Sequence, residues 1–243
     1  MKDILFEILG NLEKEKELSQ LKSRFVSMAS HEFRTPLSSV QLSASLIDRY
    51  VDKQEYGPIE KHTSRIKGSV QLLNTILNDF LNLEKLEAGV VIVNKSNTNI
   101  VHLGEEIAEE MQLICKKNQH ILYQHTGEES DFIIDPNLLK NSIINLISNA
   151  IKYSGEDTFI EFNTQIGRNQ LLVTVKDNGI GIPLEEQKSL FEPFFRANNT
   201  GSIPGTGLGL NIVKRYVELM GGRLEYWSEV NQGAIFKMFF IQE

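Results

Sequence analysis

The sequence predicts an α+β fold, in which an N-terminal helical hairpin is followed by a domain of mixed helices and strands. Apolar residues recur every three or four positions through the first ninety residues, which is the spacing of amphipathic helices. After Gly89, short β-branched runs alternate with amphipathic stretches and turn residues. A length of 243 residues is enough for two domains of about 100–150 residues each, so we place a domain boundary near this change of pattern.

The first predicted helix carries two apolar stripes that meet at Pro36. The first stripe has the spacing of a coiled-coil seam and consists of Leu18, Leu21, Phe25 and Met28. The second stripe begins just after Pro36 and consists of Leu37, Val40, Ala44 and Ile47. Because proline removes a backbone donor and bends a helix, the change of phase predicts a kink at this point.

A second helix is expected after a turn at residues 52–58, which contain Gly57-Pro58. Its apolar positions are Ile66, Val70, Leu73, Leu77 and Phe80. A lone hairpin has one contact face and cannot bury the stripes of both helices, so we expect a homodimer that forms a four-helix bundle. Packing of the stripes against the rest of the chain is the alternative.

The remaining elements alternate between helices and strands and predict a mixed, largely antiparallel sheet. They are a helix over 100–117, strands over 121–124 and 131–134, a helix over 137–153, a hairpin over 158–165 and 170–176, a helix over 207–220, and paired strands over 223–228 and 234–241. Residues 178–206 form a long stretch that is rich in Gly, Asn and Pro. A loop of that length in a compact domain is usually functional.

Composition excludes several classes of function. The net charge of −7 and the absence of a basic stripe with interleaved aromatics argue against nucleic acid as the main partner. Cys115 is the only cysteine, so no intrachain disulfide is possible and a reducing, cytoplasmic compartment is expected. No apolar run approaches the 18 or so residues that span a bilayer, so membrane attachment is expected only through an upstream segment.

The first chemical motif places a histidine, a carboxylate and a hydroxyl within one helical turn. Thr35 lies four residues after His31, so both side chains leave the same face of the helix. Glu32 is adjacent to the imidazole and can polarise it, which makes the other ring nitrogen a better nucleophile. A surface histidine with an ionic neighbour is the alternative. Two other histidines, His62 and His102, are expected to be solvated.

A second motif is a polar stripe on the helix after Pro136. Asn141, Asn145, Asn149 and Lys152 fall within roughly an 80° arc. Asparagine has low helix propensity, so three of them are a poor choice for solubility alone. Amide oxygens can ligate Mg²⁺, and a lysine can neutralise a phosphate. An ordinary solvated helix face is the alternative.

Two glycine motifs suit a nucleotide. Asp177 follows a β-branched strand, where a buried carboxylate can accept a hydrogen bond from an exocyclic amine, and Gly179 and Gly181 let the backbone approach a ring. A plain Asp-Asn-Gly turn is the alternative. The second motif opens a helix whose free N–H groups suit phosphate, and it consists of Gly205, Thr206, Gly207, Leu208 and Gly209. It follows a loop rather than a strand, which excludes a Rossmann site.

A fifth motif, Phe191 to Arg196, places three aromatic side chains in the long loop. Such a segment is expected to dock against another surface, and Arg196 can reach a phosphate. A small satellite core beneath the loop is the alternative for Phe191 and Phe194.

In this order and spacing the five motifs resemble those of a bacterial sensor histidine kinase of a two-component system. The corresponding boxes are the phosphoacceptor box His31 to Pro36, the asparagine box Asn145 to Tyr153, the first glycine box Asp177 to Gly181, the phenylalanine box Phe191 to Arg196 and the second glycine box Gly205 to Leu210. The resemblance implies an input coiled-coil segment over 1–20, a dimerisation and histidine-phosphotransfer domain over 21–91, and a catalytic ATP-binding α/β sandwich over 95–243. That sandwich is the fold of the gyrase, heat-shock chaperone and histidine-kinase superfamily.

The resemblance also implies a role for each motif residue. Asn149 would ligate Mg²⁺, and Asn145 would help to form the nucleotide site. Lys152 would contact phosphate, Tyr153 would flank the nucleotide and Asp177 would bind the adenine amine. Residues 178–206 would form the ATP lid. The other implied nucleotide-binding residues are Gly179, Gly181, Arg196, Gly205, Thr206, Gly207, Leu208 and Gly209.

The mechanism that follows is autophosphorylation of His31 by ATP and relay of the phosphoryl group to an aspartate on the receiver domain of a separate response regulator. Glu32 would act as the base or orienting group, and Thr35 would orient a water for the reverse, phosphatase reaction. A serine kinase or a conformational ATPase on the same ATP-binding fold would lack the phosphoacceptor box upstream. An inactive scaffold usually loses one of the residues His31, Asn149 and Asp177, all of which are present.

Overall fold

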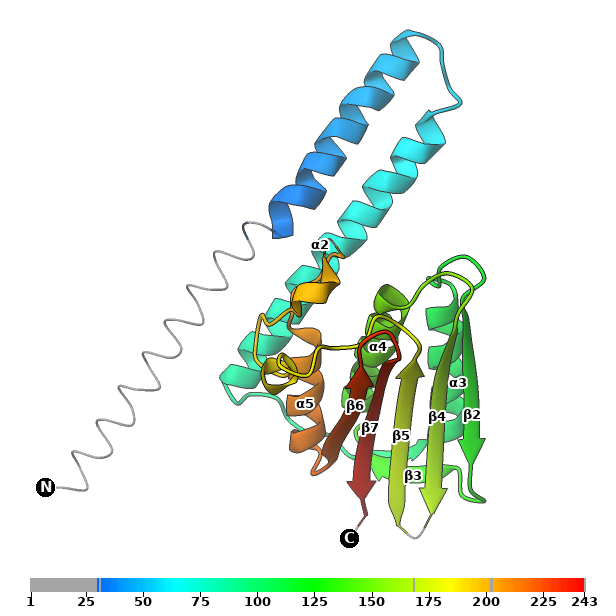
Figure 1. Cartoon of the computed structure of the whole chain (residues 1–243), viewed down its shortest axis with the longest axis vertical. Helices are drawn as coiled ribbons and strands as arrows, with labels where there is room; N and C mark the ends of the chain where they lie inside the picture. The colour runs from blue at the N-terminus through cyan, green and yellow to red at the C-terminus, as the bar shows by residue number, and fades with distance from the viewer. Residues whose placement is uncertain (1–29, 31, 168, 202, 243) are drawn as a thin grey trace, which may run out of the picture. The chain divides into compact units, whose positions relative to one another are not determined.

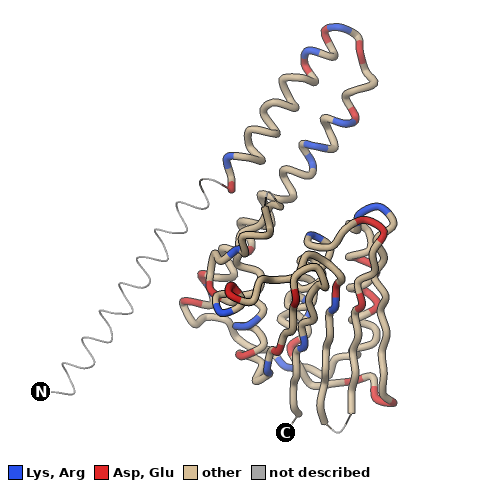
Figure 2. Tube along the Cα trace, in the orientation of Figure 1, with Lys and Arg blue, Asp and Glu red and all other residues tan. Residues whose placement is uncertain are grey.

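The computed structural model describes residue 30 and residues 32–167, 169–201 and 203–242. The chain divides into two compact units (Figure 1). The first comprises Met1–Phe80 with Pro204–Thr206, and the second comprises Leu81–Ile203 with Gly207–Glu243. Basic and acidic side chains are interspersed along both units (Figure 2).

The first unit contains the expected helical hairpin. One helix covers residues 32–52, and α2 (Ile59–Glu87) begins directly after the polar turn that was expected at residues 52–58. The last seven residues of α2, from Leu81, belong to the second unit. The expected coiled-coil stripe of residues 18–28 lies outside the described residues.

The apolar stripes of the hairpin are buried only in part. Ile76 is 3% exposed, whereas Leu37 and Leu42 on the first helix are 54% and 58% exposed and Leu77 on α2 is 47% exposed. His62 departs from expectation: it is buried, not solvated, and its ring stacks on Tyr50 with 5.6 Å between centroids. Its position was readable from the helix period, because His62 lies four residues before Ile66 and continues the apolar stripe; the expectation followed the polar residue type instead.

The second unit is a five-stranded mixed sheet with helices on one face (Figure 1). The strand order is β2-β4-β5-β7-β6, in which β2 and β4 are parallel and the other pairs are antiparallel. A separate antiparallel pair joins β1 and β3. The elements are β1 (Ser96–Asn99), α3 (Ile100–Gln112), β2 (His120–Thr126), β3 (Asp131–Ile134), α4 (Pro136–Tyr153), β4 (Phe159–Gly167), β5 (Gln170–Asp177), α5 (Gly209–Leu219), β6 (Arg223–Glu229) and β7 (Gly233–Ile241).

The core lies between the sheet and its three helices. Strands β4 and β5 alternate between buried and more exposed residues, so only one face of the sheet is fully buried. That face meets the apolar side of α4, and the largest fully buried side chains include Leu139, Ile143, Ile147, Ile160 and Phe162. Each such side chain contributes roughly 1.5–3 kcal/mol of transfer free energy. The packing fixes the rotation of α4 and therefore the direction of its polar stripe.

Two elements differ from the sequence prediction. Strand β1 was not expected, because Ser96–Asn99 has no apolar alternation and forms only by pairing with β3. Helix α3 ends at Gln112 instead of residue 117, and the chain then turns through Asn118, whose φ is 53°. Among the described residues no helix has both the length and the apolar character needed to cross a bilayer.

Candidate functional site

Helix α4 is held firmly at its start. The buried Asp135 is its N-cap, and one carboxylate oxygen accepts from the backbone N–H groups of Asn137 and Leu138 at 2.9 and 3.0 Å. The other oxygen accepts from the N–H of Asn94 at 2.7 Å. Pro136 at the first helical position is already suited to the helix. These contacts fix where α4 begins and hence which side chains follow on its polar face.

The polar face of α4 lies next to the beginning of α5. Asn145 and Asn149 are half-buried there, and Asn145 donates to the carbonyl of Asn141 at 3.0 Å. A Cβ added to Gly209 would lie 2.9 Å from Asn145 Oδ1, so the absence of a side chain lets α5 begin this close. Leu208, the N-cap of α5, supplies no side-chain cap. Amide oxygens and the positive end of a helix therefore lie side by side, which suits phosphate with a cation.

Asp177 ends β5 as a buried carboxylate. Its side chain accepts from the N–H of Gly179 at 2.8 Å, and the residue is 8% exposed. Burial raises the pKa of Asp177 above its usual range, although backbone hydrogen bonds from Gly179 and Ala234 act in the opposite direction. A buried acceptor of this kind is suited to an amine donor from a ligand.

The loop after Asp177 packs on the end of α4. The N–H of Ile180 donates to the carbonyl of Tyr153 at 3.2 Å, and a Cβ on Gly179 would lie 2.5 Å from that same oxygen. Burial raises the pKa of the Tyr153 hydroxyl, and the positive charge of Arg196 lowers it in part. The loop and the helix end therefore form one surface.

Gly181 is the tightest glycine of this loop, and its replacement is expected to destabilise the domain. Its φ is +64°, and a Cβ there would lie 1.9 Å from the carbonyl oxygen of Glu229. We expect Gly181→Ala to lower the free energy of unfolding by about 3 kcal/mol, measured by urea denaturation. Gly167→Ala is the control, because nothing lies within 4 Å of the added carbon. Equal stability of the two variants would contradict the prediction.

Sequence reasoning missed two residues that support this loop. Gly233 in the β6–β7 turn has φ +87°, and a Cβ there would lie 2.0 Å from the carbonyl oxygen of Asp177. Ser228 Oγ donates to the carbonyl of Gly233 at 2.8 Å and accepts from the N–H of Ile182 at 2.9 Å. The glycine in the turn was a local signal, but its proximity to Asp177 depends on the pairing of β5 with β7.

The phenylalanine motif contacts the second glycine motif. The N–H of Phe194 donates to the carbonyl of Gly207 at 3.0 Å, and both residues have positive φ. A Cβ on Gly207 would lie 2.6 Å from the carbonyl oxygen of Phe195. Arg196 donates to the carbonyl of Ile203 within the same loop. Phe191 packs edge-on against Tyr226, so this aromatic residue does form part of a small core under the loop.

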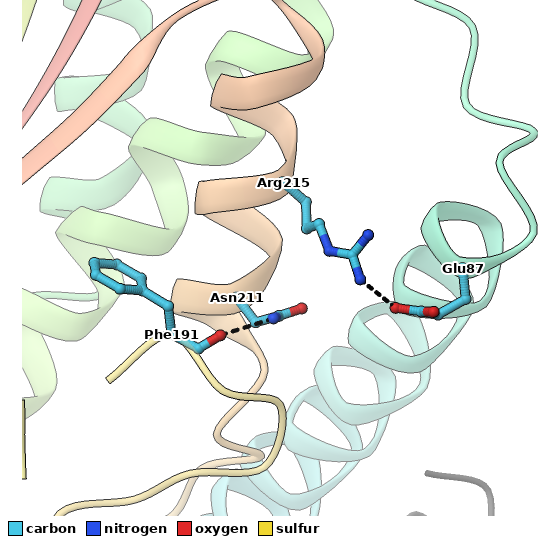
Figure 3. A network of polar contacts seen from close by, with 4 residues as sticks. All are labelled: Glu87, Phe191, Asn211 and Arg215. Atoms are coloured by element: carbon cyan, nitrogen blue, oxygen red, sulfur yellow. Dashed lines mark hydrogen bonds and ion pairs between the residues drawn. The ribbon is translucent and has the colours of Figure 1, made fainter. Parts of the chain in front are cut away.

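Helix α5 joins this loop to the end of α2 (Figure 3). Asn211 is buried and donates from Nδ2 to the carbonyl of Phe191 at 2.8 Å. One turn later Arg215 forms an ion pair with Glu87 at 2.6 Å. The first turns of α5 are therefore held by polar contacts as well as by apolar packing.

The structure places most, but not all, of the expected site residues in the second unit. The second unit contains Asn145, Asn149, Lys152, Tyr153, Asp177, Gly179, Gly181, Arg196, Gly207, Leu208 and Gly209. Gly205 and Thr206 are grouped with the first unit, where Thr206 Oγ1 donates to Asp79 at 2.8 Å. Glu32 is half-buried and Thr35 is exposed in the first unit. His31 lies outside the described residues.

The donor set of α4 fits Mg²⁺ that arrives with a nucleotide. Among the described residues no group of three His, Cys, Asp or Glu side chains is placed to hold a metal ion. Mg²⁺ usually binds through one or two protein oxygens together with phosphates and water, and the amide oxygen of Asn149 is a hard donor of the right type.

Two family profiles match the chain in the order expected from the motifs. The His Kinase A (phospho-acceptor) domain matches residues 21–89. The histidine kinase-, DNA gyrase B- and HSP90-like ATPase matches residues 134–243.

Known proteins of similar sequence and fold match most of the chain. The signal transduction histidine-protein kinase ArlS of Staphylococcus aureus (strain USA300) is 32% identical over 223 residues, which are 89% of this chain and 48% of ArlS. The chain thus spans about half the length of the curated relatives it matches. Full-length ShkA in complex with AMPPNP has a TM-score of 0.64 and 25% identity, over 89% of this chain and 45% of ShkA.

A third similar structure is histidine kinase ThkA in complex with the response regulator protein TrrA, with a TM-score of 0.59 and 21% identity over 95% of this chain and 64% of that chain. At this identity the likeness concerns the fold. Together, a phosphoacceptor-domain match, an ATPase-domain match and the identity with ArlS show that this chain belongs to the sensor histidine kinases.

Proposed function

We propose that this chain is the catalytic core of a two-component signalling kinase, which phosphorylates its own His31 from ATP and passes the phosphoryl group to an aspartate of a response regulator. The observation that carries the proposal is the buried Asp177 at the end of β5, whose loop packs on the same helix that presents Asn145 and Asn149. The match of a phosphoacceptor domain to residues 21–89 supports His31 as the acceptor.

Asp177 is proposed to recognise the base of ATP. Its carboxylate would accept from the exocyclic amine of adenine, a group that guanine lacks at that position. The small residues Gly179 and Gly181 leave room for the ring beside the backbone. Tyr153 would flank the nucleotide from the end of α4. Burial of the carboxylate makes the pairing selective, because a ligand without a donor would leave it unsatisfied.

The phosphates are proposed to lie between α4 and the beginning of α5. Lys152 and Arg196 would neutralise phosphate charge, and the N–H groups at residues 207–209 would donate at the positive end of α5. Gly205 and Thr206 would complete this glycine motif when the lid closes over ATP. Asn149 would hold Mg²⁺, which when bound neutralises negative charge on the β- and γ-phosphates, and Asn145 would contribute to the nucleotide site beside it.

The transfer step is a substitution at the γ-phosphorus. An imidazole nitrogen of His31 would form the new N–P bond, the bond from phosphorus to the β,γ-bridging oxygen would break, and ADP would leave. Glu32 is one residue from His31 and would orient the imidazole or accept its proton. The phosphohistidine is a reactive donor, which suits onward transfer to a carboxylate of a receiver domain.

The partners proposed for this core are a second copy of the chain and a response regulator. The exposed leucines of the hairpin, Leu37, Leu42 and Leu77, are the surface that a four-helix bundle would bury. ThkA, a kinase of this fold, has been solved in complex with a response regulator. Light scattering should give twice the mass of the chain, and a monomer at micromolar concentration would contradict the dimer. The core is proposed to act in the cytoplasm, where ATP is supplied.

The test of the proposed reaction is the chemistry of the label. The chain should incorporate phosphate from γ-labelled ATP with Mg²⁺, and the label should be stable in alkali and lost in acid, as expected of a phosphorus–nitrogen bond. Transfer to an added response regulator should convert it to an alkali-labile acyl phosphate. Acid-stable label would identify a hydroxyl acceptor and contradict the proposal.

Thr35 is proposed to serve the reverse reaction only. Thr35 follows His31 by four residues in the sequence, which is the spacing of one helical turn, and Thr35 is exposed, so its hydroxyl can orient a water toward a phosphorylated receiver aspartate. We expect Thr35→Ala to retain autophosphorylation within about threefold and to lose phosphatase activity by about tenfold or more. Both rates are measured with the same response regulator, and Thr35→Ser is the control. A variant that kept phosphatase activity and lost kinase activity would be the wrong result.

A further inference from the structure

The end of α4 is held by a lysine from a distant part of the chain. Lys116, in the turn between α3 and β2, donates from Nζ to the carbonyl of Lys152 at 2.8 Å and to the carbonyl of Ser154 at 2.5 Å. The two loops that meet here, α3–β2 and α4–β4, lie side by side at one end of the sheet (Figure 1). Lys116 is not part of any of the five motifs.

This helix end needs an external partner. The last carbonyls of a helix have no intrahelical donor, and many helices satisfy them through a left-handed glycine after the last turn. Here the C-cap is Ser154, whose φ of −92° and ψ of 157° are extended. The ammonium group of Lys116 replaces the missing donors, and a positive charge at this end also interacts favourably with the helix dipole.

The carbonyl of Tyr153 lies between those of Lys152 and Ser154, and it is held by the loop that follows Asp177. Tyr153 O accepts from the N–H of Ile180 at 3.2 Å, and Gly179 packs directly against it. Three consecutive carbonyls are therefore shared between Lys116 and the loop that carries Asp177. A change in the position of the helix end would shift that loop, because Gly179 leaves no space between them.

Lys116 is itself fixed by a buried glutamine. Gln119 is 1% exposed, accepts from the N–H of Lys116 at 3.1 Å and donates to the carbonyl of Gly155 at 3.2 Å. In addition, Asn118 donates to Asp157 at 2.7 Å. These bonds join the α3–β2 turn to the α4–β4 turn at several points, so the place of Lys116 is determined by its surroundings.

We propose that Lys116 is a positioning residue of the nucleotide site, which sets the last turn of α4 and, through the carbonyl of Tyr153, the loop of Asp177. The inference rests on the proposed binding of ATP at that loop. Lys116 acts on the backbone of α4 from outside the site, and its effect reaches the ligand through Tyr153 and Ile180.

The first measurement is nucleotide affinity. Lys116→Met keeps the length of the side chain and removes its charge and donors, and we expect AMPPNP with Mg²⁺ to bind about tenfold more weakly, by calorimetry. Lys116→Arg retains charge and donors and should bind within about threefold of wild type. The matched control is Lys117→Met, which removes the same groups from the exposed neighbour and should leave affinity unchanged.

The second measurement needs no nucleotide. Hydrogen exchange of the Ile180 amide should be about tenfold faster in Lys116→Met than in Lys117→Met, because its acceptor is no longer held. A uniform increase across the core amides would indicate a loss of global stability and would overturn the positioning role. So would wild-type affinity together with wild-type exchange at Ile180. If the unmodified chain binds no AMPPNP, the proposed function fails, whereas the exchange comparison still decides the role of Lys116.

Discussion

Replacing His31 by glutamine is expected to abolish phosphorylation of the chain by ATP and to leave nucleotide binding within about twofold of the wild-type value. Glutamine is similar in size and polarity but its amide is not a nucleophile toward phosphorus. Binding should survive because His31 is not among the residues proposed to bind ATP, and most of those residues belong to the second unit. The two readouts are incorporation of label from γ-labelled ATP and calorimetric affinity for AMPPNP. Comparing the two readouts distinguishes the loss of the phosphoryl acceptor from the loss of the nucleotide-binding site.

The matched control is His102→Gln, which changes an exposed histidine at the beginning of α3. It should retain full label, since His102 is not part of the phosphoacceptor box. Undiminished label in His31→Gln would show that another residue accepts the phosphoryl group. Loss of AMPPNP binding in that variant would show that the chemical role of His31 cannot be isolated in this way.

Replacing Asp177 by asparagine is expected to weaken ATP binding about a hundredfold and to abolish autophosphorylation at micromolar ATP. The side chain is almost the same size, but a charged acceptor becomes an amide that presents a donor as well. A second ligand isolates the contact. Purine riboside triphosphate lacks the exocyclic amine, so wild type should bind it much more weakly than ATP, whereas Asp177→Asn should discriminate less between the two. If both proteins discriminated equally between ATP and purine riboside triphosphate, the adenine amine would not contact Asp177.

The same substitution is expected to stabilise the domain in the absence of nucleotide. Burial raises the pKa of Asp177, so the folded state binds the proton more tightly than the unfolded state does. The stability that the carboxyl contributes is fully present below its ordinary pKa of about 3.9 and is lost as the pH rises through the raised value. Asparagine does not ionise, so its contribution to stability is not lost as the pH rises. Asp177→Asn should therefore melt about 3 °C higher than wild type at pH 7, and the difference should shrink toward pH 4. A lower melting temperature at pH 7 would contradict this reasoning.

These two expectations together describe a carboxylate retained at a cost to stability. Burying a charged carboxylate lowers the stability of the protein in the absence of nucleotide, and a ligand that donates a hydrogen bond to it offsets that cost. The backbone around Asp177 is also closely packed, because Gly181 and Gly233 lie where a Cβ would meet backbone oxygens. The proposed role of this loop in ligand binding predicts both results.

Local patterns were sufficient for most of the elements. The Asp135-Pro136 start signal placed α4 within one residue, and strand β3 was predicted with its observed bounds. The hairpin of β4 and β5 and the closing pair of β6 and β7 were also expected. Caps, periodicity and turn residues are encoded within a few positions, so they can be read without the rest of the chain.

Non-local pairing could not be read in the same way. Strand β1 has no apolar alternation, and the parallel pairing of β2 with β4 joins segments on either side of α4. His62 is a different case: its spacing of four residues from Ile66 placed it on the apolar stripe, but the stacking on Tyr50 that accompanies its burial depends on the packing of the hairpin. These features depend on which surfaces meet after folding.

The sequence by itself determined the family, the order of the motifs and the types of side chain that an ATP-dependent phosphotransfer requires. The tertiary structure decided that the Asp177 loop packs on the end of α4, that Gly233 lies against Asp177, and that Lys116 caps the C-terminal end of α4. The physical reason is that the reactive and ligand-binding groups of a motif are residue types a few positions apart, which can be read directly from the sequence. Positioning depends instead on backbone carbonyls and close packing between segments far apart in the chain, and such contacts leave no periodic signal.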